Sequence, residues 1–299
     1  MIIIKLGGSL ITYKSSDSDI PLRWNEKKMN YRTRDDKIRL VGRAISDCYE
    51  GDMIMIHGGG THGHRTVTRW REGIARGSDK MKPWEVRWRM SQLTERILNI
   101  TGEVGIPTIE ISPLDVFTTN GKSITTSNPT PIIQALERRT VPLLRGDLVV
   151  DEGGGWNVLS GDDQAIELAK CSRDQILPEI DRMIMCLDVT GLMETRNGET
   201  RVIKEVSESD FHGDLFKKLA GWEKGSEKSV DVSGGIITKT VSAHMIAAMG
   251  CPVNIIGGEN VDEDLRRILE GKEAGTLFLP FKGSSKCKKG KCIERGPVE

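Results

Sequence analysis

Short apolar runs that end in glycine recur along the chain. The first, MIIIKL, is followed by Gly7–Gly8, and DMIMIH at residues 52–57 leads into Gly58–Gly60. RMIMCL at 182–187 and PVNII at 252–256 also lead into turns that contain glycine. Runs that are apolar at almost every position are typical of strands buried on both faces, as in parallel sheets. The sequence therefore predicts a parallel sheet whose strands end in glycine turns.

Segments with helical spacing alternate with these runs. Ile38, Val41, Ile45 and Cys48 recur at intervals of three and four residues, which predicts an amphipathic helix over 35–50. The same pattern predicts helices at 83–104, at 130–139, between Gly235 and Gly250, and at 262–270. Strands that alternate with helices predict an α/β fold, here a three-layer αβα sandwich with a mainly parallel central sheet.

Turn signals and interruptions refine this architecture. Asn120–Gly121 between Thr- and Ile-rich flanks predicts a hairpin, and residues 141–163 predict a strand and a second hairpin before a helix. The charged stretch 15–34 and the Gly- and Lys-rich stretch 221–230 are interpreted as insertions. We expect one domain over 1–280, divided into lobes of about 1–160 and about 161–280, and a mobile basic tail over 281–299.

Composition excludes several classes of partner. The 43 basic and 43 acidic residues give a formal net charge of zero, so nothing in the overall charge favours nucleic acid or a membrane surface. No apolar run reaches membrane-spanning length, and the N-terminus has no signal-peptide pattern. The six cysteines show no framework spacing, and we expect a cytoplasmic protein with reduced thiols. The pair Cys287 and Cys292 is interpreted as part of a solvated tail rather than a metal or redox site.

The glycine turns offer a way to bind phosphate. Glycine lets backbone N–H groups approach an anion, and the N-terminus of a following helix adds a positive dipole. No GxxxxGK[ST] loop is present, and no GxGxxG follows the first strand. The alternative for any single turn is that glycine simply ends the strand.

Lysines and aspartates near these turns supply charge. Lys5 lies inside an apolar strand, where an unpaired ammonium is costly, so it is a candidate site residue. Lys14 and Lys239 follow the stretches GGSLIT and SGGIIT and would otherwise be ordinary surface lysines. Asp162 and Asp163 either cap a helix, hold the lysines in position or help to bind magnesium.

Three of the five histidines lie within IHGGGTHGHR, residues 56–65. The spacing of His57, His62 and His64 matches no familiar zinc pattern, and the three adjacent glycines favour an anion instead. His57 is interpreted as structural, and a structural role is plausible for His62, which has no assigned function. His64 would lie where a helix begins, placed to donate a hydrogen bond to a phosphate.

Several motifs together resemble the amino acid kinase superfamily, over residues 1–14 and roughly 36–280. They are IIIKLGGSLITYK, HGGGTHGH, RGDLVV, LSGDD, DVTGL and SGGIITK, in that family's order and approximate spacing. Lys14 and the glycine run that ends in GH resemble the isopentenyl phosphate kinase branch.

The resemblance implies roles for the matching residues. The groups that bind and neutralise the transferred phosphoryl group would be Lys5, Gly7, Gly8, Ser9, Lys14 and Lys239. The acceptor phosphate would be held by Gly58, Gly59, Gly60, His64, Ser160 and Gly161. Asp162 would organise the lysines, with Asp163 as an equally possible register, and the nucleotide would also contact Asp188, Gly191 and Gly235. The resemblance implies ATP and Mg²⁺ as cofactors, no metal bound by the protein alone, and a homodimer.

Two features leave the acceptor open. His62 stands where the family usually has an aromatic residue. Trp84 and Trp88 share one helical face, which predicts either a wall for an apolar chain or part of the core. Arg87, between them, would instead suit a more polar acceptor.

The expected function is therefore transfer of the γ-phosphoryl group of ATP to a small organic monophosphate, isopentenyl phosphate by resemblance. Within the same superfamily the alternatives are another phosphate, a phosphonate such as fosfomycin, or an amino-acid carboxylate. A nucleotide-binding regulator without catalysis is the alternative from another class. The presence of Lys5, Lys14 and Lys239 together argues against it.

Overall fold

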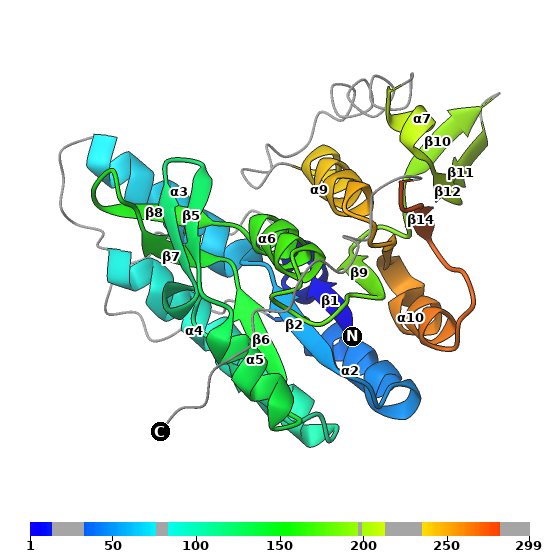
Figure 1. Cartoon of the computed structure of the whole chain (residues 1–299), viewed down its shortest axis with the longest axis horizontal. Coiled ribbons are helices and arrows are strands. Elements are labelled where there is room, and N and C mark those ends of the chain that lie inside the picture. The colour runs from blue at the N-terminus through cyan, green and yellow to red at the C-terminus, as the bar shows by residue number, and fades with distance from the viewer. Residues whose placement is uncertain (14–32, 76–82, 197–198, 213–234, 282–299) are drawn as a thin grey trace, which may run out of the picture.

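The central sheet has eight strands in the order β12-β14-β13-β9-β1-β2-β6-β3 (Figure 1). The protein is described by a computed structural model that covers residues 1–13, 33–75, 83–196, 199–212 and 235–281. β1 (Ile2–Leu6) lies between β9 (Arg182–Leu187) and β2 (Met53–His57) and is parallel to both. The other strands are β3 (Thr108–Glu110), β6 (Val141–Arg145), β12 (Glu205–Val206), β13 (Val253–Gly257) and β14 (Thr276–Phe278). Only the β13–β14 pair is antiparallel, so within the described residues the sheet is mainly parallel, as predicted.

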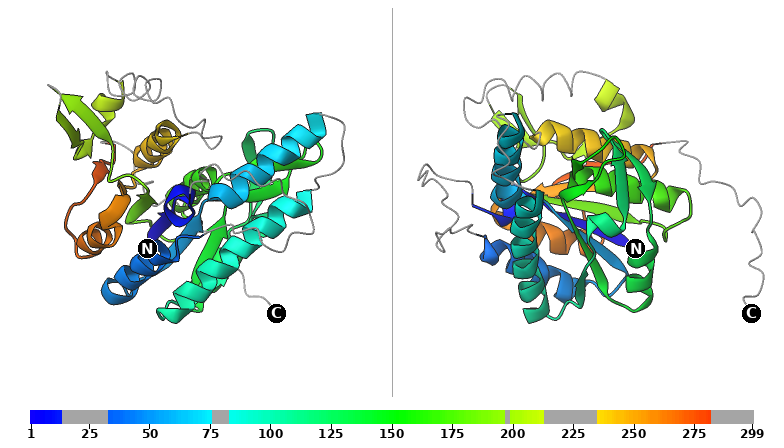
Figure 2. Two further views of the ribbon diagram at one scale, coloured as in Figure 1. Left: turned by 180° about the vertical axis from the view of Figure 1, so that it is seen from behind. Right: turned by 90° about the vertical axis from the view of Figure 1, so that its left-hand side faces the viewer.

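Helices cover both faces of the sheet (Figure 2). One hydrophobic core joins the sheet to α2 (Asp35–Cys48), α4 (Pro83–Glu103) and α10 (Val261–Leu269). The other joins it to α5 (Thr130–Glu137), α6 (Gly161–Arg173) and α9 (Ile236–Ala248). The predicted αβα sandwich and its main helices are thereby confirmed.

The alternation of side chains along β1 decides where its one charge goes. Ile2, Ile4 and Leu6 belong to the core on the α2 side, and Ile3 belongs to the core on the α6 side. Because successive strand residues point to opposite faces, Lys5 points with Ile3 toward α6. The sheet therefore directs the ammonium of Lys5 toward the N-terminal end of α6.

Further elements complete the fold. They are α1 (Gly8–Ile11), α3 (Gly60–Ala75), the 3₁₀ turns η1 (Pro113–Asp115) and η2 (Gly258–Asn260), and the hairpin of β7 (Asp147–Val150) with β8 (Trp156–Leu159). The predicted hairpin at Asn120–Gly121 is formed by β4 (Phe117–Asn120) and β5 (Ser123–Ser127). Its turn is one residue later than predicted, because Asn120 pairs with Ser123 and Gly121 takes the positive φ of 60°.

Some features were not predicted, and some predictions lie outside the described residues. The hairpin of β10 (Met193–Arg196) and β11 (Glu199–Val202), the short strand β12 and α7 (Glu208–His212) have no strong hydrophobic pattern. Lys14, almost all of the 15–34 insertion, all of 221–230, and the tail after Phe281 with Cys287 and Cys292 are not described. Within the described residues, no helix is both long and apolar enough to cross a membrane.

Candidate active site

The glycine turns after β1 and β2 pack directly against each other. The register Leu6↔His57 places Gly7–Gly8 beside Gly58–Gly60, and the Gly58 N–H donates to the Leu6 carbonyl at 2.8 Å. A Cβ atom on Gly58 would lie 2.8 Å from the Gly8 nitrogen, and one on Gly8 would overlap the backbone of Gly60. Gly60 also has a φ of +48°. Only glycine fits this contact, so glycine here does more than end a strand.

Gly58–Gly60 form what we call the glycine cradle. In the described part of the chain, the amides of Gly59 and Gly60 donate to no other protein group. Gly60 is the first residue of α3, so the dipole of that helix adds to these amides. Thr12 fastens the cradle, because its Oγ1 donates to the Gly8 carbonyl at 2.7 Å and accepts from the Thr61 amide at 3.2 Å. Free amides at a helix N-terminus suit an anion such as phosphate.

A buried ion pair lies next to the cradle. The Nζ of Lys5 is 2.8 Å from Oδ1 of Asp162, and their side chains are 2% and 9% exposed. Burial alone would raise the pKa of Asp162, but the charges of Lys5 and Lys239 outweigh it and hold the pKa below its usual value. Asp162 thus pairs directly with Lys5 and also interacts electrostatically with Lys239.

The two adjacent aspartates of α6 have different partners. Ser160 is the N-cap of α6, and its Oγ accepts from the Asp163 amide at 3.1 Å and donates to the Asp163 carboxylate at 2.7 Å. Asp162 faces Lys5 instead. Gly161 packs closely against Ile56 and Lys5, because a Cβ atom on Gly161 would lie 3.0 Å from the Ile56 side chain and 3.4 Å from Lys5. The geometry thus joins Asp162, and not Asp163, to the lysines.

The remaining predicted nucleotide contacts gather around the end of β9. Ser9 donates a hydrogen bond to Oδ1 of Asp188 at 2.7 Å, which joins the turn after β1 to the turn after β9. Gly191 has a φ of +150°, and its neighbour Leu192 donates to Oγ1 of Thr276 at 2.8 Å. Gly235 is the N-cap of α9, the helix that carries Lys239.

The three clustered histidines have different environments. His57 is fully buried in β2, and burial lowers its pKa to about 3. His62 is also buried, and burial together with the charge of Arg89 lowers its pKa to about 4. His64 is half-buried in the first turns of α3. Among the described residues no group of three His, Cys, Asp or Glu side chains could hold a metal ion.

An apolar cluster lies along α3, the helix that begins at the cradle. Val67 and Trp70 of α3 pack with Val86 of α4 and Leu148 of β7, and Val158 of β8 packs against them. None of these was a candidate from the sequence, although Val67 and Trp70 are three residues apart on a helix that begins at the cradle. The spacing of Val67 and Trp70 was therefore the sequence signal for this cluster.

The tryptophans that were candidates for a wall or a core face lie elsewhere. Trp84 and Trp88 are 48% and 43% exposed, so they form no part of the core, while Val86 and Met90 occupy the buried face of α4. Arg87 donates to the Leu148 carbonyl and to Oγ of Ser112, both at 3.1 Å. Its guanidinium is thereby held by the protein.

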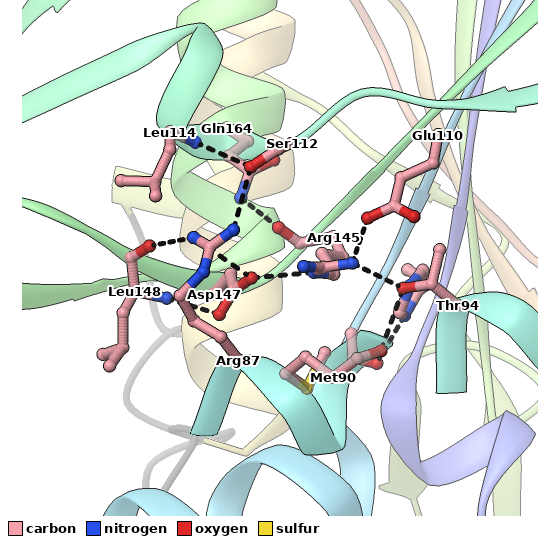
Figure 3. A network of polar contacts seen from close by, with 12 residues as sticks. Arg87, Met90, Thr94, Glu110, Ser112, Leu114, Arg145, Asp147, Leu148 and Gln164 are labelled. Atoms are coloured by element: carbon pink, nitrogen blue, oxygen red, sulfur yellow. Dashed lines mark hydrogen bonds and ion pairs between the residues drawn. The ribbon is translucent and has the colours of Figure 1, made fainter. Parts of the chain in front are cut away.

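Arg145 is a second buried cation that sequence reasoning missed. Its side chain is 3% exposed and lies in a network with Asp147, Glu110 and Thr94 (Figure 3). The signal was present, because Arg145 ends an apolar run, VPLLR, as Lys5 interrupts MIIIKL.

Comparison with known proteins gives a consistent answer. The model of the amino acid kinase family matches residues 1–257. The chain is 25% identical to isopentenyl phosphate kinase of Methanocaldococcus jannaschii over 285 residues, which is 92% of this chain and 96% of that one. It is 28% identical to isopentenyl phosphate kinase of Arabidopsis thaliana, over 68% of this chain and 64% of that one. A solved structure of an isopentenyl phosphate kinase superposes with a TM-score of 0.69 at 21% identity, covering 92% of this chain and 99% of that one.

Proposed function

The chain belongs to the amino acid kinase family, and from that premise we propose that it is an isopentenyl phosphate kinase. It transfers the γ-phosphoryl group of ATP to isopentenyl phosphate and releases isopentenyl diphosphate and ADP. The observation that carries this proposal is the glycine cradle beside the buried Lys5–Asp162 pair, with Lys239 near the same carboxylate. Together they place two lysines and one buried carboxylate beside backbone amides that can receive an anion.

The reaction requires charge neutralisation more than proton transfer. An oxygen of the acceptor phosphate attacks the γ-phosphorus, a new P–O bond forms, and the bond to the bridging oxygen of ADP breaks. The attacking oxygen is already anionic, so the step needs no strong general base. Repulsion between two phosphates is the main obstacle, and Lys5 and Lys239 reduce it. Asp162 keeps these ammonium groups in place.

We assign the acceptor phosphate to the cradle and the nucleotide to the turns of β1 and β9. The acceptor would be held by the backbone of Gly58–Gly60 and by His64, with Ser160 and Gly161 beside it. The nucleotide phosphates and their surroundings would be held by Lys5, Gly7, Gly8, Ser9, Asp188, Gly191, Gly235 and Lys239. Lys14 has the same proposed role as the other lysines and lies outside the described residues. This assignment divides the chain into an acceptor-binding lobe of about 1–160 and a nucleotide-binding lobe of about 161–280.

Magnesium is proposed to enter with ATP. Mg²⁺ keeps several waters and is commonly held by one or two carboxylates plus substrate phosphates, so it needs no cage of protein ligands. The carboxylate of Asp188 lies at the turn after β9, which is assigned to the nucleotide, and fits that requirement. The ion would supply further neutralisation of the transferred charge.

An apolar acceptor tail fits the rest of the site. Val67 and Trp70 of α3, the helix that begins at the cradle, form an apolar cluster with Val86 and Leu148. Arg87 is held by Leu148 and Ser112 and by Asp147 at 3.6 Å, so it does not favour a polar acceptor. A short hydrocarbon chain attached to a phosphate matches this arrangement of charge and apolar surface.

The direct test is an ADP-release assay with several acceptors. We expect isopentenyl phosphate to give the highest kcat/KM in a series with dimethylallyl phosphate, a furan-type phosphate, fosfomycin and acetylglutamate. A better rate with another phosphate or with fosfomycin would refute the acceptor and keep the kinase class. A preference for acetylglutamate would indicate a carboxylate kinase, and no turnover with any acceptor would favour a regulator.

His64 provides a test of how the acceptor is recognised. Replacing His64 with Ala removes one donor to a charged phosphate, which should raise KM for isopentenyl phosphate about 10- to 100-fold. KM for ATP should stay within about twofold, since the nucleotide is assigned to other residues. His64→Asn keeps an N–H donor and serves as the matched control. Equal KM values for His64→Ala and wild type would contradict the assignment.

We also propose that the enzyme is a cytoplasmic homodimer. The four described cysteines, Cys48, Cys171, Cys186 and Cys251, are free thiols, which suits a reducing compartment. Light scattering after size-exclusion chromatography measures the oligomeric state directly.

A further inference from the structure

A buried network connects α4 with β6 and β3 (Figure 3). Arg145, the last residue of β6, donates from Nε to Oδ2 of Asp147 at 2.8 Å, and one of its terminal nitrogens contacts Glu110 of β3. The same nitrogen donates to Oγ1 of Thr94 on α4 at 3.2 Å. Two carboxylates compensate the buried charge, and the planar guanidinium fixes the direction of each hydrogen bond.

Thr94 joins this arginine to the cradle. Its Oγ1 is 2.9 Å from Nε2 of His57, and Nδ1 of His57 is 3.1 Å from the carbonyl oxygen of Gly58. His57 is neutral at pH 7, because burial lowers its pKa to about 3. A neutral ring has one N–H, and a carbonyl oxygen can only accept, so the proton lies on Nδ1.

The direction of the whole chain of hydrogen bonds follows from that proton. Since Nδ1–H donates to Gly58, Nε2 must accept, and its donor is the hydroxyl of Thr94, which shares its one proton between Nε2 and the Met90 carbonyl, each 2.9 Å from Oγ1. Thr94 in turn accepts from Arg145. Each group donates toward the cradle, and such a series strengthens its members by polarisation.

The end of this series sets the orientation of one cradle amide. In a trans peptide the C=O and the N–H point in opposite directions. The carbonyl of Gly58 and the amide of Gly59 belong to one peptide unit, so fixing the carbonyl fixes the amide. The backbone of Arg145 also bonds to α6, because its carbonyl accepts from Nε2 of Gln164 at 2.6 Å. Gln164 lies two residues after Asp162 on that helix.

We propose that Arg145, Thr94 and His57 are positioning residues for phosphoryl transfer, forming a relay that aims the Gly59 amide at the acceptor phosphate. The proposal rests on the proposed function, which places that phosphate in the cradle. None of the three residues touches the substrate. They act through the Gly58–Gly59 peptide.

The sharpest test removes one hydroxyl from the relay. Thr94→Val keeps the shape of the side chain and deletes both the donor to His57 and the acceptor for Arg145. We expect it to weaken calorimetric binding of isopentenyl phosphate and to raise the KM for this acceptor, each about tenfold, as for the loss of one hydrogen bond to a charged ligand. KM for ATP should not change. Thr94→Ser, which retains the hydroxyl, should restore acceptor binding.

Thr101→Val is the matched control for a purely structural effect. Thr101 is also buried on α4 and also donates to the carbonyl four residues earlier, that of Ile97 at 3.0 Å, as Thr94 does to Met90. It should lower the thermal midpoint about as much as Thr94→Val and leave acceptor affinity unchanged. Equal loss of acceptor affinity in both variants, or none in Thr94→Val, would overturn the relay.

A second measurement separates the relay from the proposed function. The ¹⁵N shifts of the His57 ring at pH 7.5 should show the Nδ1–H form in the wild type, and Thr94→Val should shift the Nε2 signal as its donor is lost. An Nε2–H form in the wild type would overturn the relay. A wild type that binds no isopentenyl phosphate would overturn the proposed function, and the ring signals would then decide the relay on their own.

Discussion

Lys5 and Arg145 are two buried cations of the same sheet, and their partners and roles differ. Lys5 pairs in register with Ile56, and Arg145 pairs with the next residue, His57. They therefore point to opposite faces, Lys5 toward Asp162 on α6 and Arg145 toward Thr94 on α4. Lys5 therefore lies on the α6 face of the sheet, and Arg145 lies on the α4 face.

The balance of charge is what distinguishes the two regions. On the Lys5 side two lysines act on the one buried carboxylate, Asp162. On the other side Arg145 and Arg87 face Asp147 and Glu110, and the charges cancel. The compact ammonium of Lys5 can direct an N–H toward a ligand, whereas the planar guanidinium of Arg145 bonds to protein groups. The difference teaches that the same buried charge serves chemistry or scaffold according to how completely it is neutralised.

Lys5→Met gives the largest expected effect and tests the catalytic half of the comparison. Removing a cation that neutralises the transferred phosphoryl group should lower kcat about a thousandfold. The change also leaves Asp162 buried without its partner, so Lys5→Met combined with Asp162→Asn should recover the thermal midpoint but not the rate. Steady-state kinetics and thermal unfolding of both variants measure this.

The control is a buried lysine elsewhere in the fold. Lys37 of α2 donates to the carbonyls of Gly258 and Glu259 and pairs with the Glu259 carboxylate at 3.0 Å. Lys37→Met should lower stability and leave kcat within about threefold. If Lys5→Met behaved in the same way, Lys5 would be a structural cation like Arg145.

Arg145→Met tests the structural half. It leaves Asp147 and Glu110 without their cation, and breaking a buried ion pair from one side costs about 3–5 kcal/mol of unfolding free energy. We expect urea denaturation to show that loss, while kcat of the folded enzyme falls far less than in Lys5→Met. A variant of normal stability with a kcat as low as that of Lys5→Met would break the comparison.

The sequence predicts one of these cations and not the other for a physical reason. Lys5 is conspicuous because it interrupts an apolar strand, and glycine turns around it already suggest an anion. Arg145 ends its strand, where a charged residue is ordinary. Its role depends on Thr94 and His57, which come from distant segments, and no local pattern shows that three such residues meet.

The same limit applies to details of the site. Asp162 and Asp163 adjoin one turn, and only the packing of α6 shows that one faces Lys5 while the other meets Ser160. Trp84 and Trp88 do share a helical face, as their spacing predicts, but tertiary packing turned Val86 inward instead. Hydrophobic periodicity thus predicted the sheet and its main helices, and it left open which residues of adjacent elements meet.

Acidification separates the two regions by pH. The folded chain keeps His57 and His62 neutral, with pKa values lowered from 6.5 to about 3 and about 4, so the unfolded chain binds more protons between about pH 4 and 6.5. The free energy of unfolding should therefore fall with decreasing pH across that window, by up to about 1.4 kcal/mol per pH unit for each histidine.

Asp162, with its pKa lowered from 3.8, contributes stability that is present above about pH 3.8 and lost only below it. Loss between about pH 5 and 6.5 thus reports on the two buried histidines and not on the Lys5 pair, because Glu259 and Glu270, with pKa values lowered from 4.5, respond only at lower pH. Urea midpoints at pH 7.5, 6, 5 and 4.5 measure the slope, and His62→Phe should halve it because one of the two titrating groups is gone. A flat profile, or an unchanged slope in that variant, would mean that these rings are not held neutral.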